Sequence, residues 1–335
     1  MDALGLELTN DIPVINTEMH SGLFTRFPNY SGEVAFGGRA YPMSWLELSR
    51  PTGKYIARFP LYVLNAFIRR HSICVAGNAC APGFVLPLPD ATQGMEQFQF
   101  DEREHCGTLI LNVPGIPILK DAIVFQAHPF MKLNIHSQWE NLEQYLGAMH
   151  SKYRVRARKA LQCSGHLQTQ SFSGQQLDAL LLSRCAWLLA ETLRNKTLAL
   201  SPDLAGMLSA FRDTYKERFA IHTYTENGEL RGFISTLEDG KQLHALHLGY
   251  DAAIARDTHI YQRMMYDRVG QAIESRAEVL HLGRTATEIK STLGAVPVPN
   301  SFAVYVRNPM LRAMVAWWKK RWYKPAEYTL REPFK

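Results

Sequence analysis

Two turn signals, Asn227-Gly228 and Asp239-Gly240, constrain the fold of this chain more than any other feature. Each lies between two mainly apolar runs, and an Asn-Gly or Asp-Gly pair in that position is typical of a tight hairpin. The sequence therefore predicts a three-stranded antiparallel meander with strands over 219–225, 230–237 and 243–248.

Helical patterns flank this meander. Apolar residues recur at helical spacing over 141–162, 175–193 and 202–216 before it, and over 255–276 after it. The remaining elements are predicted to alternate between strand and helix, over 278–282, 285–293, 301–306 and 309–322. Helices, a meander and then a β-α-β unit predict an α+β sheet domain.

The N-terminal half is less regular. Residues 1–30 are predicted to be irregular, and apolar runs over 72–76, 108–113 and 122–126 predict strands. Since 335 residues exceed the usual size of one domain, two domains are expected. The predicted division is an N-terminal domain over 1–140, a C-terminal domain over 141–322 and a basic tail over 323–335.

The positive charge is concentrated at the C-terminus. The formal net charge of the chain is +6. The last 29 residues hold eight basic and two acidic side chains, so their own net charge is also +6. Trp317, Trp318 and Trp322 lie in the same segment. A basic, tryptophan-rich end is attracted to an anionic membrane surface. The alternatives are a helix that packs Met310, Met314 and Trp318 on the core, or contact with nucleic acid.

A second basic cluster lies inside the predicted helix over 141–162. On a helix, Arg154 and Arg158 share one face, and Lys152, Arg156 and Lys159 share another. Such a segment suits the phosphates of coenzyme A, of a lipid head group or of tRNA. A solvated helix face is the structural alternative.

Composition excludes several classes of protein. Hydrophobic residues make up 46% of the chain and charged residues 20%, which is ordinary globular usage. No run of 18 apolar residues occurs, and the N-terminus lacks the basic region of a secretory signal. Five scattered cysteines without CxxC spacing predict reduced thiols in a cytoplasm, and no metal site is expected.

Several strings resemble a known family. Leu248-Gly-Tyr-Asp251, the segment 261–266 and above all Leu282-Gly-Arg-Thr-Ala-Thr-Glu-Ile-Lys-Ser-Thr-Leu-Gly-Ala295 are similar to the GCN5-related N-acyltransferase (GNAT) fold. Together with the basic helix, they resemble the tandem-GNAT acyltransferases related to Fem-type aminoacyl transferases. The match is strong over 140–320 and weaker at the turn with Gly77-Asn78.

The resemblance implies an α+β fold with two GNAT-like domains in tandem, mixed sheets flanked by helices and a cleft between the domains. It also implies transfer of an acyl group from acyl-CoA, a co-substrate, to an amine, with no permanently bound cofactor. Some enzymes that acylate sphingoid-type bases look like this group. The expected acceptor is therefore an amine-bearing lipid or similar amphiphile at the cytoplasmic face of the inner membrane.

One departure concerns the coenzyme. Single-domain GNAT enzymes cradle the pyrophosphate in a glycine-rich loop at a helix N-terminus. Here the corresponding segment, Gly249-Tyr-Asp-Ala-Ala-Ile-Ala-Arg256, has one glycine. The phosphates of CoA must then be held by the other domain or by the basic helix, or the donor is a different molecule.

Candidate site residues follow from the chemistry of N-acyl transfer, which needs a base and hydrogen-bond donors. His247 is the predicted base, and His281 is the alternative candidate. For each, the structural alternative is a histidine that packs in the core. The predicted proton or hydrogen-bond donors, which half-buried packing would also explain, are Tyr250, Tyr153 and Tyr266.

The string after the strand over 278–282 offers further candidates. Glu288 is predicted to act with Arg284 as a pair, with Lys290 beside them as a binding residue. Alternatively, Thr285 and Glu288 form a capping box without any substrate. The predicted donor- and substrate-binding residues are Arg284, Lys290, Lys152, Tyr153, Arg154, Arg156 and Asn78.

Two other functions remain open. An aminoacyl-tRNA-dependent, Fem-like transferase acting on a peptidoglycan precursor would use the basic helix to bind RNA. A non-catalytic GNAT-fold recognition protein in polysaccharide or envelope biogenesis would need no assembled site.

Overall fold

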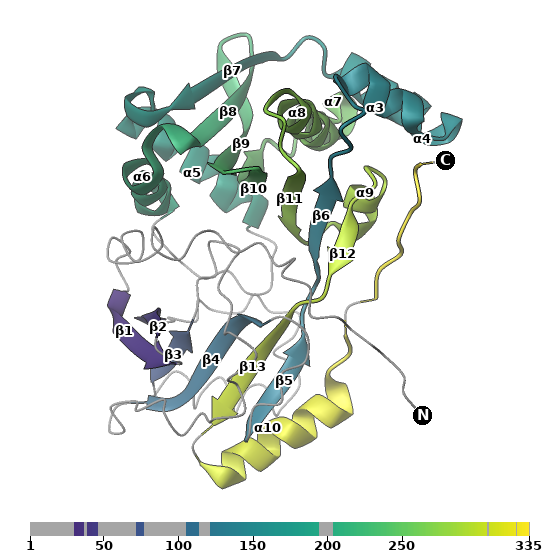
Figure 1. The fold of residues 1–335 in the computed structure, drawn as a ribbon. Coiled ribbons are helices and arrows are strands. Elements are labelled where there is room, and N and C mark those ends of the chain that lie inside the picture. The colour runs from purple at the N-terminus through teal and green to yellow at the C-terminus, as the bar shows by residue number, and fades with distance from the viewer. Residues whose placement is uncertain are drawn as a thin grey trace.

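The computed structural model (Figure 1) describes residues 30–36, 39–45, 72–76, 105–113, 121–193, 204–306, 308–325 and 327–334, the first four ranges by their backbone alone. The predictions for Asn78 and for residues 1–29 lie outside these ranges. The described chain is an α+β protein with two mixed sheets.

The larger sheet has seven strands. Its strands follow the order β12 (Val296–Val298), β6 (Phe130–Asn134), β11 (Val279–Arg284), β10 (Gln242–Tyr250), β9 (Glu229–Asp239), β8 (Phe219–Glu226) and β7 (Gln168–Ser173). The pairing of β10 with β11 is parallel, and the other neighbours are antiparallel. The strands β8, β9 and β10 form the predicted meander, which is confirmed.

The second sheet has six strands. They follow the order β1 (Tyr30–Phe36), β2 (Arg39–Trp45), β3 (Ser72–Ala76), β4 (His105–Val113), β13 (Ser301–Val306) and β5 (Ala122–Gln126). The strands predicted over 72–76, 108–113 and 122–126 are thus confirmed. Whether this sheet is a second GNAT-like unit stays a prediction.

Two connections between strands of the different sheets lie side by side (Figure 1). One crossing joins β5 to β6 and the other joins β12 to β13. The Ala127 N–H donates to the carbonyl oxygen of the buried Asn300 over 2.9 Å, so the crossings are hydrogen-bonded to each other. Sheet membership therefore does not follow the division predicted at residue 140. The strand over 301–306 pairs within the six-stranded sheet.

Helices cover both faces of the seven-stranded sheet. On one face, α5 (Ala179–Leu193) and α6 (Leu204–Tyr215) pack on β8, β9 and β10. On the other face, α8 (Ile260–Glu274) packs on β9, β10 and β11 and is contacted by α3 (Leu142–Ala148) and α4 (Ser151–Cys163). The shorter helices are η3 (Gly174–Gln176), η4 (Lys216–Arg218), α7 (Ala255–Thr258) and α9 (Thr287–Ser291).

Side chains on the two faces of β9 belong to two separate apolar cores. Adjacent residues Phe233 and Ile234 of β9 face opposite sides of the sheet, as the two-residue period of a strand requires. Phe233 belongs to the core under α5 and α6, and Ile234 belongs to the core under α3, α4 and α8.

The predicted helix over 141–162 is two helices. Asn141 caps α3 by accepting a hydrogen bond from the Gln144 N–H over 3.0 Å, which is typical of a helix start. The chain is extended at Met149, so α4 begins anew at Ser151. Helical periodicity alone does not show such a break, because both pieces keep their apolar side toward α8.

The last helix, α10 (Pro309–Trp322), packs on β5 and β13, and its predicted bounds are confirmed. After it, the chain returns to the seven-stranded sheet. There the ring of Phe334 lies 5.4 Å from Trp139 and 5.7 Å from Tyr145, measured between ring centroids. In the ranges that the structure describes, no helix has both the length and the hydropathy of a membrane span.

Two glycines give opposite predictions for substitution by alanine. A Cβ at Gly249 in β10 would lie 2.5 Å from backbone atoms of Leu188 and Leu189, whereas none of its neighbours would lie within 4 Å of a Cβ at Gly270 in α8. Gly249→Ala is expected to lower the free energy of unfolding by about 1–3 kcal/mol, since the backbone of α5 must move to admit the added methyl group. Gly270→Ala is expected to raise it by up to about 1 kcal/mol. Urea unfolding of both variants measures these changes, and equal effects would contradict the observed packing of α5 on β10.

Candidate functional site

Two parallel strands diverge at the centre of the larger sheet. Strand β10 pairs with β11 only through Gln242, Leu243 and His244, opposite Val279, Leu280 and His281. On its other edge β11 pairs with β6 from Val279 to Arg284, and β10 shifts register relative to β9 between Ala245 and Leu248. The carboxyl ends of diverging parallel strands are a common position for ligand sites in mixed sheets.

The turn after β11 holds strained backbone. Gly283, Thr285 and Ala286 have φ angles of +70°, +66° and +48°. For a β-branched residue such as Thr285, this left-handed conformation costs about 1–2 kcal/mol. Strain of this kind persists where surrounding structure imposes it, and it is concentrated at functional sites. Arg284 lies within this turn.

The Arg284 side chain is half-buried. Its guanidinium carbon lies 5.7 Å from the ring centroid of Phe130 in β6, and burial lowers the pKa of Arg284 from its ordinary value. Among residues with described side chains, no carboxylate forms an ion pair with it. The Lys290 ammonium, 3% exposed, donates to the Arg284 carbonyl oxygen over 2.7 Å. Lys290 therefore holds the turn that presents Arg284.

Glu288 has a different partner from the one predicted. Its carboxylate pairs with Arg331 of the C-terminal segment over 2.5 Å, at an exposed position, and not with Arg284. The capping box is also wrong. The residue that caps α9 is Ala286, so Glu288 is the second helical residue, and Thr285 lies before the cap. The left-handed turn moved the helix start by one residue.

Both histidine candidates lie in the core. His247 Nδ1 lies 3.1 Å from Ser235 Oγ, and its ring packs edge-on against Phe211 of α6 at 5.0 Å. His281 stacks on His244 with 4.5 Å between the ring centroids, and its Nε2 lies 2.9 Å from Gln242 Oε1. The contacts of His247 with Ser235 and Phe211 are those of a packed core histidine, and the described polar contacts of Arg284 and Glu288 involve other residues.

The tyrosine candidates are separated from one another. Tyr250 lies at the end of β10, with its ring centroid 6.2 Å from that of Tyr261. Tyr153 is buried in the core, beneath the Lys152 ammonium at 4.8 Å from the centroid. Burial raises the pKa of Tyr266 to about 12, which keeps its hydroxyl protonated at neutral pH. Of the three, only Tyr250 lies at the diverging strand ends.

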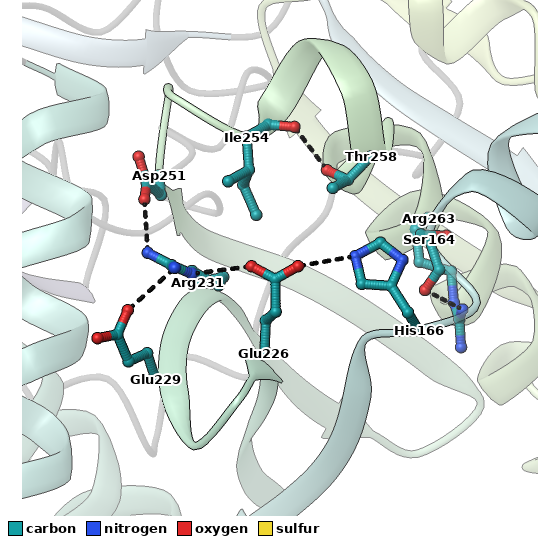
Figure 2. Close-up of polar contacts among 9 residues, drawn as sticks. All are labelled: Ser164, His166, Glu226, Glu229, Arg231, Asp251, Ile254, Thr258 and Arg263. Atoms are coloured by element: carbon teal, nitrogen blue, oxygen red, sulfur yellow. Dashed lines mark hydrogen bonds and ion pairs between the residues drawn. The ribbon is translucent and has the colours of Figure 1, made fainter.

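The loop after β10 is tied down by ion pairs (Figure 2). Arg231 contacts Asp251 in this loop over 3.2 Å, and it also contacts Glu226 and Glu229 of the β8–β9 hairpin. His166 Nε2 reaches Glu226 from the end of α4 over 3.1 Å. The space beside Gly249, near the end of β10, is filled by the backbone of α5.

The basic helix α4 uses its two faces differently. Arg154 donates to the carbonyl oxygens of Gly147 and Met149 at the end of α3, each over 3.3 Å, and Arg158 pairs with Glu143 over 2.9 Å. Lys152, Arg156 and Lys159 are exposed. Arg154 therefore stabilises the α3–α4 break, and only the second face is available to an anionic ligand.

A polar cleft of about 530 Å³ lies between β7, β8 and α8. Arg268, 6% exposed, lies in its wall and donates to Gln271, and its Nε has no hydrogen-bond partner in the described structure. Beside it, the Tyr224 hydroxyl donates to Asp267 over 2.8 Å. Sequence reasoning missed this cleft. The only signal was the pair of opposite charges four residues apart, Arg263 and Asp267, which bond over 2.8 Å.

The chain was compared with known proteins. No protein-family model matches it, and no curated protein matches it in sequence. Solved structures match its fold. The C-terminal domain of a protein described as a "Putative Lysylphosphatidylglycerol Synthetase" from Agrobacterium fabrum superposes with a TM-score of 0.50 and 12% identity, over 89% of each chain. A structure described as FemX superposes with a TM-score of 0.50 and 12% identity, over 90% of this chain and 98% of that one.

At this identity the similarity shows the fold alone. These neighbours have GNAT-like folds, and the described mixed sheet flanked by helices fits that class. The fold expectation drawn from the residues is confirmed at this level. Membership of a particular family stays a prediction.

Glu288→Gln tests the corrected role of Glu288. We expect little change in melting temperature or in any activity that the chain has, because the carboxylate lies in an exposed ion pair and does not cap α9. Thermal unfolding and turnover measured on the same preparation check this. Loss of activity at an unchanged melting temperature would restore the predicted pairing with substrate.

His222, beside the polar cleft, predicts a pH dependence of stability. Burial and the nearby Arg268 lower the pKa of His222 from 6.5 to about 3. The unfolded chain therefore takes up this proton first, so stability is complete above pH 6.5 and falls as the pH drops toward 3. Between pH 7 and 5, the loss should be about 2 kcal/mol.

Urea unfolding of His222→Asn across this range is expected to show a flatter pH dependence than the parent chain. His128→Asn, at an exposed position, is the matched control and should leave the slope unchanged. Equal slopes for the parent and His222→Asn would exclude His222 as the titrating group.

Proposed function

We propose that the protein is a GNAT-fold N-acyltransferase that transfers an acyl group from acyl-CoA to the amine of a lipid or similar amphiphile, with sphingoid-type bases as the model acceptors. The fold and the strand divergence support a transferase. The observation that carries the proposal is Arg284, a half-buried cation at the end of β11 beside left-handed backbone, with no carboxylate partner among described side chains.

A half-buried guanidinium suits an anionic group or a developing negative charge. It presents several N–H donors in one plane, and such donors stabilise an oxyanion best where water is excluded. In acyl transfer, the carbonyl oxygen of the thioester gains negative charge as the amine attacks. We assign Arg284 to that oxygen or to an anionic part of the donor.

The proposed reaction is a direct displacement. The neutral amine nitrogen attacks the thioester carbon, the C–N bond forms, the C–S bond breaks and CoA leaves as the thiolate. The proton lost by the amine balances the proton gained by the thiolate. His247, which contacts Ser235 and Phe211, stays a candidate for the base. Tyr250, at the end of β10, is the candidate that protonates the thiolate, and His247 or water accepts the amine proton.

The phosphates of the donor need another site, because α5 fills the space beside Gly249. The exposed face of α4, with Lys152, Arg156 and Lys159, supplies three cations without an acid on that helix. We assign this face to the phosphates.

A second candidate has a specific observation in its favour. Two of the solved structures that match, each with a TM-score of 0.50, are FemX and a domain named for lysylphosphatidylglycerol synthesis. Transfer of an aminoacyl group from tRNA would use the same attack on a carbonyl carbon, with an ester in place of the thioester. The exposed face of α4 would then contact the RNA backbone.

The experiment supplies purified protein with long-chain acyl-CoA and a sphingoid-type base, or with aminoacyl-tRNA and phospholipid or peptidoglycan precursor. Mass spectrometry then detects the amide or ester product. Amide formed from acyl-CoA supports the first proposal, and product formed only from charged tRNA supports the second. No product from either donor would favour the non-catalytic reading.

Arg284→Gln tests the site. Removing one donor to a developing oxyanion lowers turnover about 100-fold to 1000-fold in comparable sites, and we expect a loss of that size. Folding should be retained, because removing a half-buried charge without an ion-pair partner is not expected to destabilise the chain strongly. The matched control is Arg184→Gln, at an exposed position of α5, which should keep full turnover. Unchanged turnover in Arg284→Gln would contradict the assignment.

A further inference from the structure

Helix α10 packs on the six-stranded sheet through one side only. Val315 is its buried residue, and the Trp318 ring lies 6.1 Å from Phe125 of β5. The Lys319 ammonium also lies over Phe125, at 5.6 Å. Contrary to the packing alternative, Met310 is 81% exposed and does not join the core. Trp317 is 53% exposed.

The opposite side of α10 forms a continuous exposed stripe. Residues three, four and seven apart share a helix face, so Met310, Ala313 and Trp317 lie in line, followed by basic residues at the helix end and just beyond it. The outward stripe of α10 is Met310, Ala313, Trp317, Lys320, Arg321 and Lys324, all exposed. The helix contains no acidic residue.

We propose that the outward stripe of α10 docks on the surface of an anionic lipid bilayer. Large apolar side chains left in water on an otherwise packed protein mark a contact surface. Tryptophan suits the boundary between head groups and acyl chains, and cations beside it are attracted to anionic lipids. A helix of 14 residues is too short to cross a bilayer, so α10 lies in the plane of the interface.

A groove continues this surface at the basic end. It has a volume of about 620 Å³ and lies between β5 and the end of α10. Ile123 and Val124 line one side, and Lys319, Lys320 and Tyr323 line the other. Apolar strand atoms beside ammonium groups match the two parts of an anionic phospholipid, an acyl chain and a phosphate. Lys320 belongs to both the stripe and the groove.

This proposal does not depend on the transferase chemistry. It rests on α10 and β5, whereas the proposed reaction rests on Arg284 and the strand divergence. A chain that binds vesicles and has no activity would therefore refute one proposal and leave the other supported.

The experiment measures cosedimentation of the full chain with vesicles of phosphatidylcholine alone, or of phosphatidylcholine mixed with phosphatidylglycerol. We expect binding to the mixed vesicles at low salt, weak binding to the neutral vesicles and loss of binding at about 0.5 M salt. Trp317→Ala should weaken binding about tenfold. Lys320→Gln combined with Arg321→Gln should weaken it about 30-fold.

Two matched controls separate this stripe from general surface effects. Trp187→Ala removes a tryptophan from α5 that, at 63%, is somewhat more exposed than Trp317. Arg156→Gln combined with Lys159→Gln removes two exposed charges from α4. Both should bind mixed vesicles as the parent does, and circular dichroism should show that all four variants are folded.

Three outcomes would overturn the proposal. They are no binding to anionic vesicles at low salt, equal binding to neutral vesicles, and loss of binding in the α4 variant with retention in the α10 variants. The last result would move the basic contact to α4, where single-stranded RNA would be the competing partner to test.

Discussion

The architecture depends on the hydrogen-bonded pair of crossings at Ala127 and Asn300. At this point the chain leaves β5 for β6 and later leaves β12 for β13, so each sheet receives strands from segments far apart in sequence. The Asn300 side chain also donates to the carbonyl oxygen of His128 over 3.4 Å. Because backbone polar groups buried between two sheets need partners, the crossings satisfy each other, and neither sheet is complete without both.

The same connection links the C-terminal segment to the candidate site. Strand β13 and helix α10 belong to one sheet, and the residues after α10 return to the other. There the Arg331 N–H donates to Ser291 Oγ over 2.9 Å, and its side chain pairs with Glu288, both on α9. Phe334 fills the space beside Gly294. The C-terminus thus braces the short helix that follows the strained turn, which helps to explain how Thr285 is held in a costly conformation.

The candidate site at Arg284 and the outward stripe of α10 arise from different structural features. Arg284 is positioned by the left-handed turn and by Lys290, and it is half-buried without a carboxylate partner among the described side chains. The outward stripe of α10 needs no strain, because an amphipathic helix with one buried residue row leaves the opposite row in water. The proposed reaction of an amphiphile is compatible with both, since its amine would enter the site while its chains stay in the bilayer.

The sequence alone determined the meander and α10. Turn signals at Asn227-Gly228 and Asp239-Gly240 and helical periodicity depend on neighbouring residues, so these elements could be predicted directly. Only the tertiary structure decided the partners of those elements. The local sequence does not predict that β13 pairs within the six-stranded sheet or that Glu288 pairs with Arg331. Nor does it predict that His247 packs on Phe211 or that Met310 is exposed to solvent. Such contacts join residues distant in sequence, and packing, not periodicity, selects them.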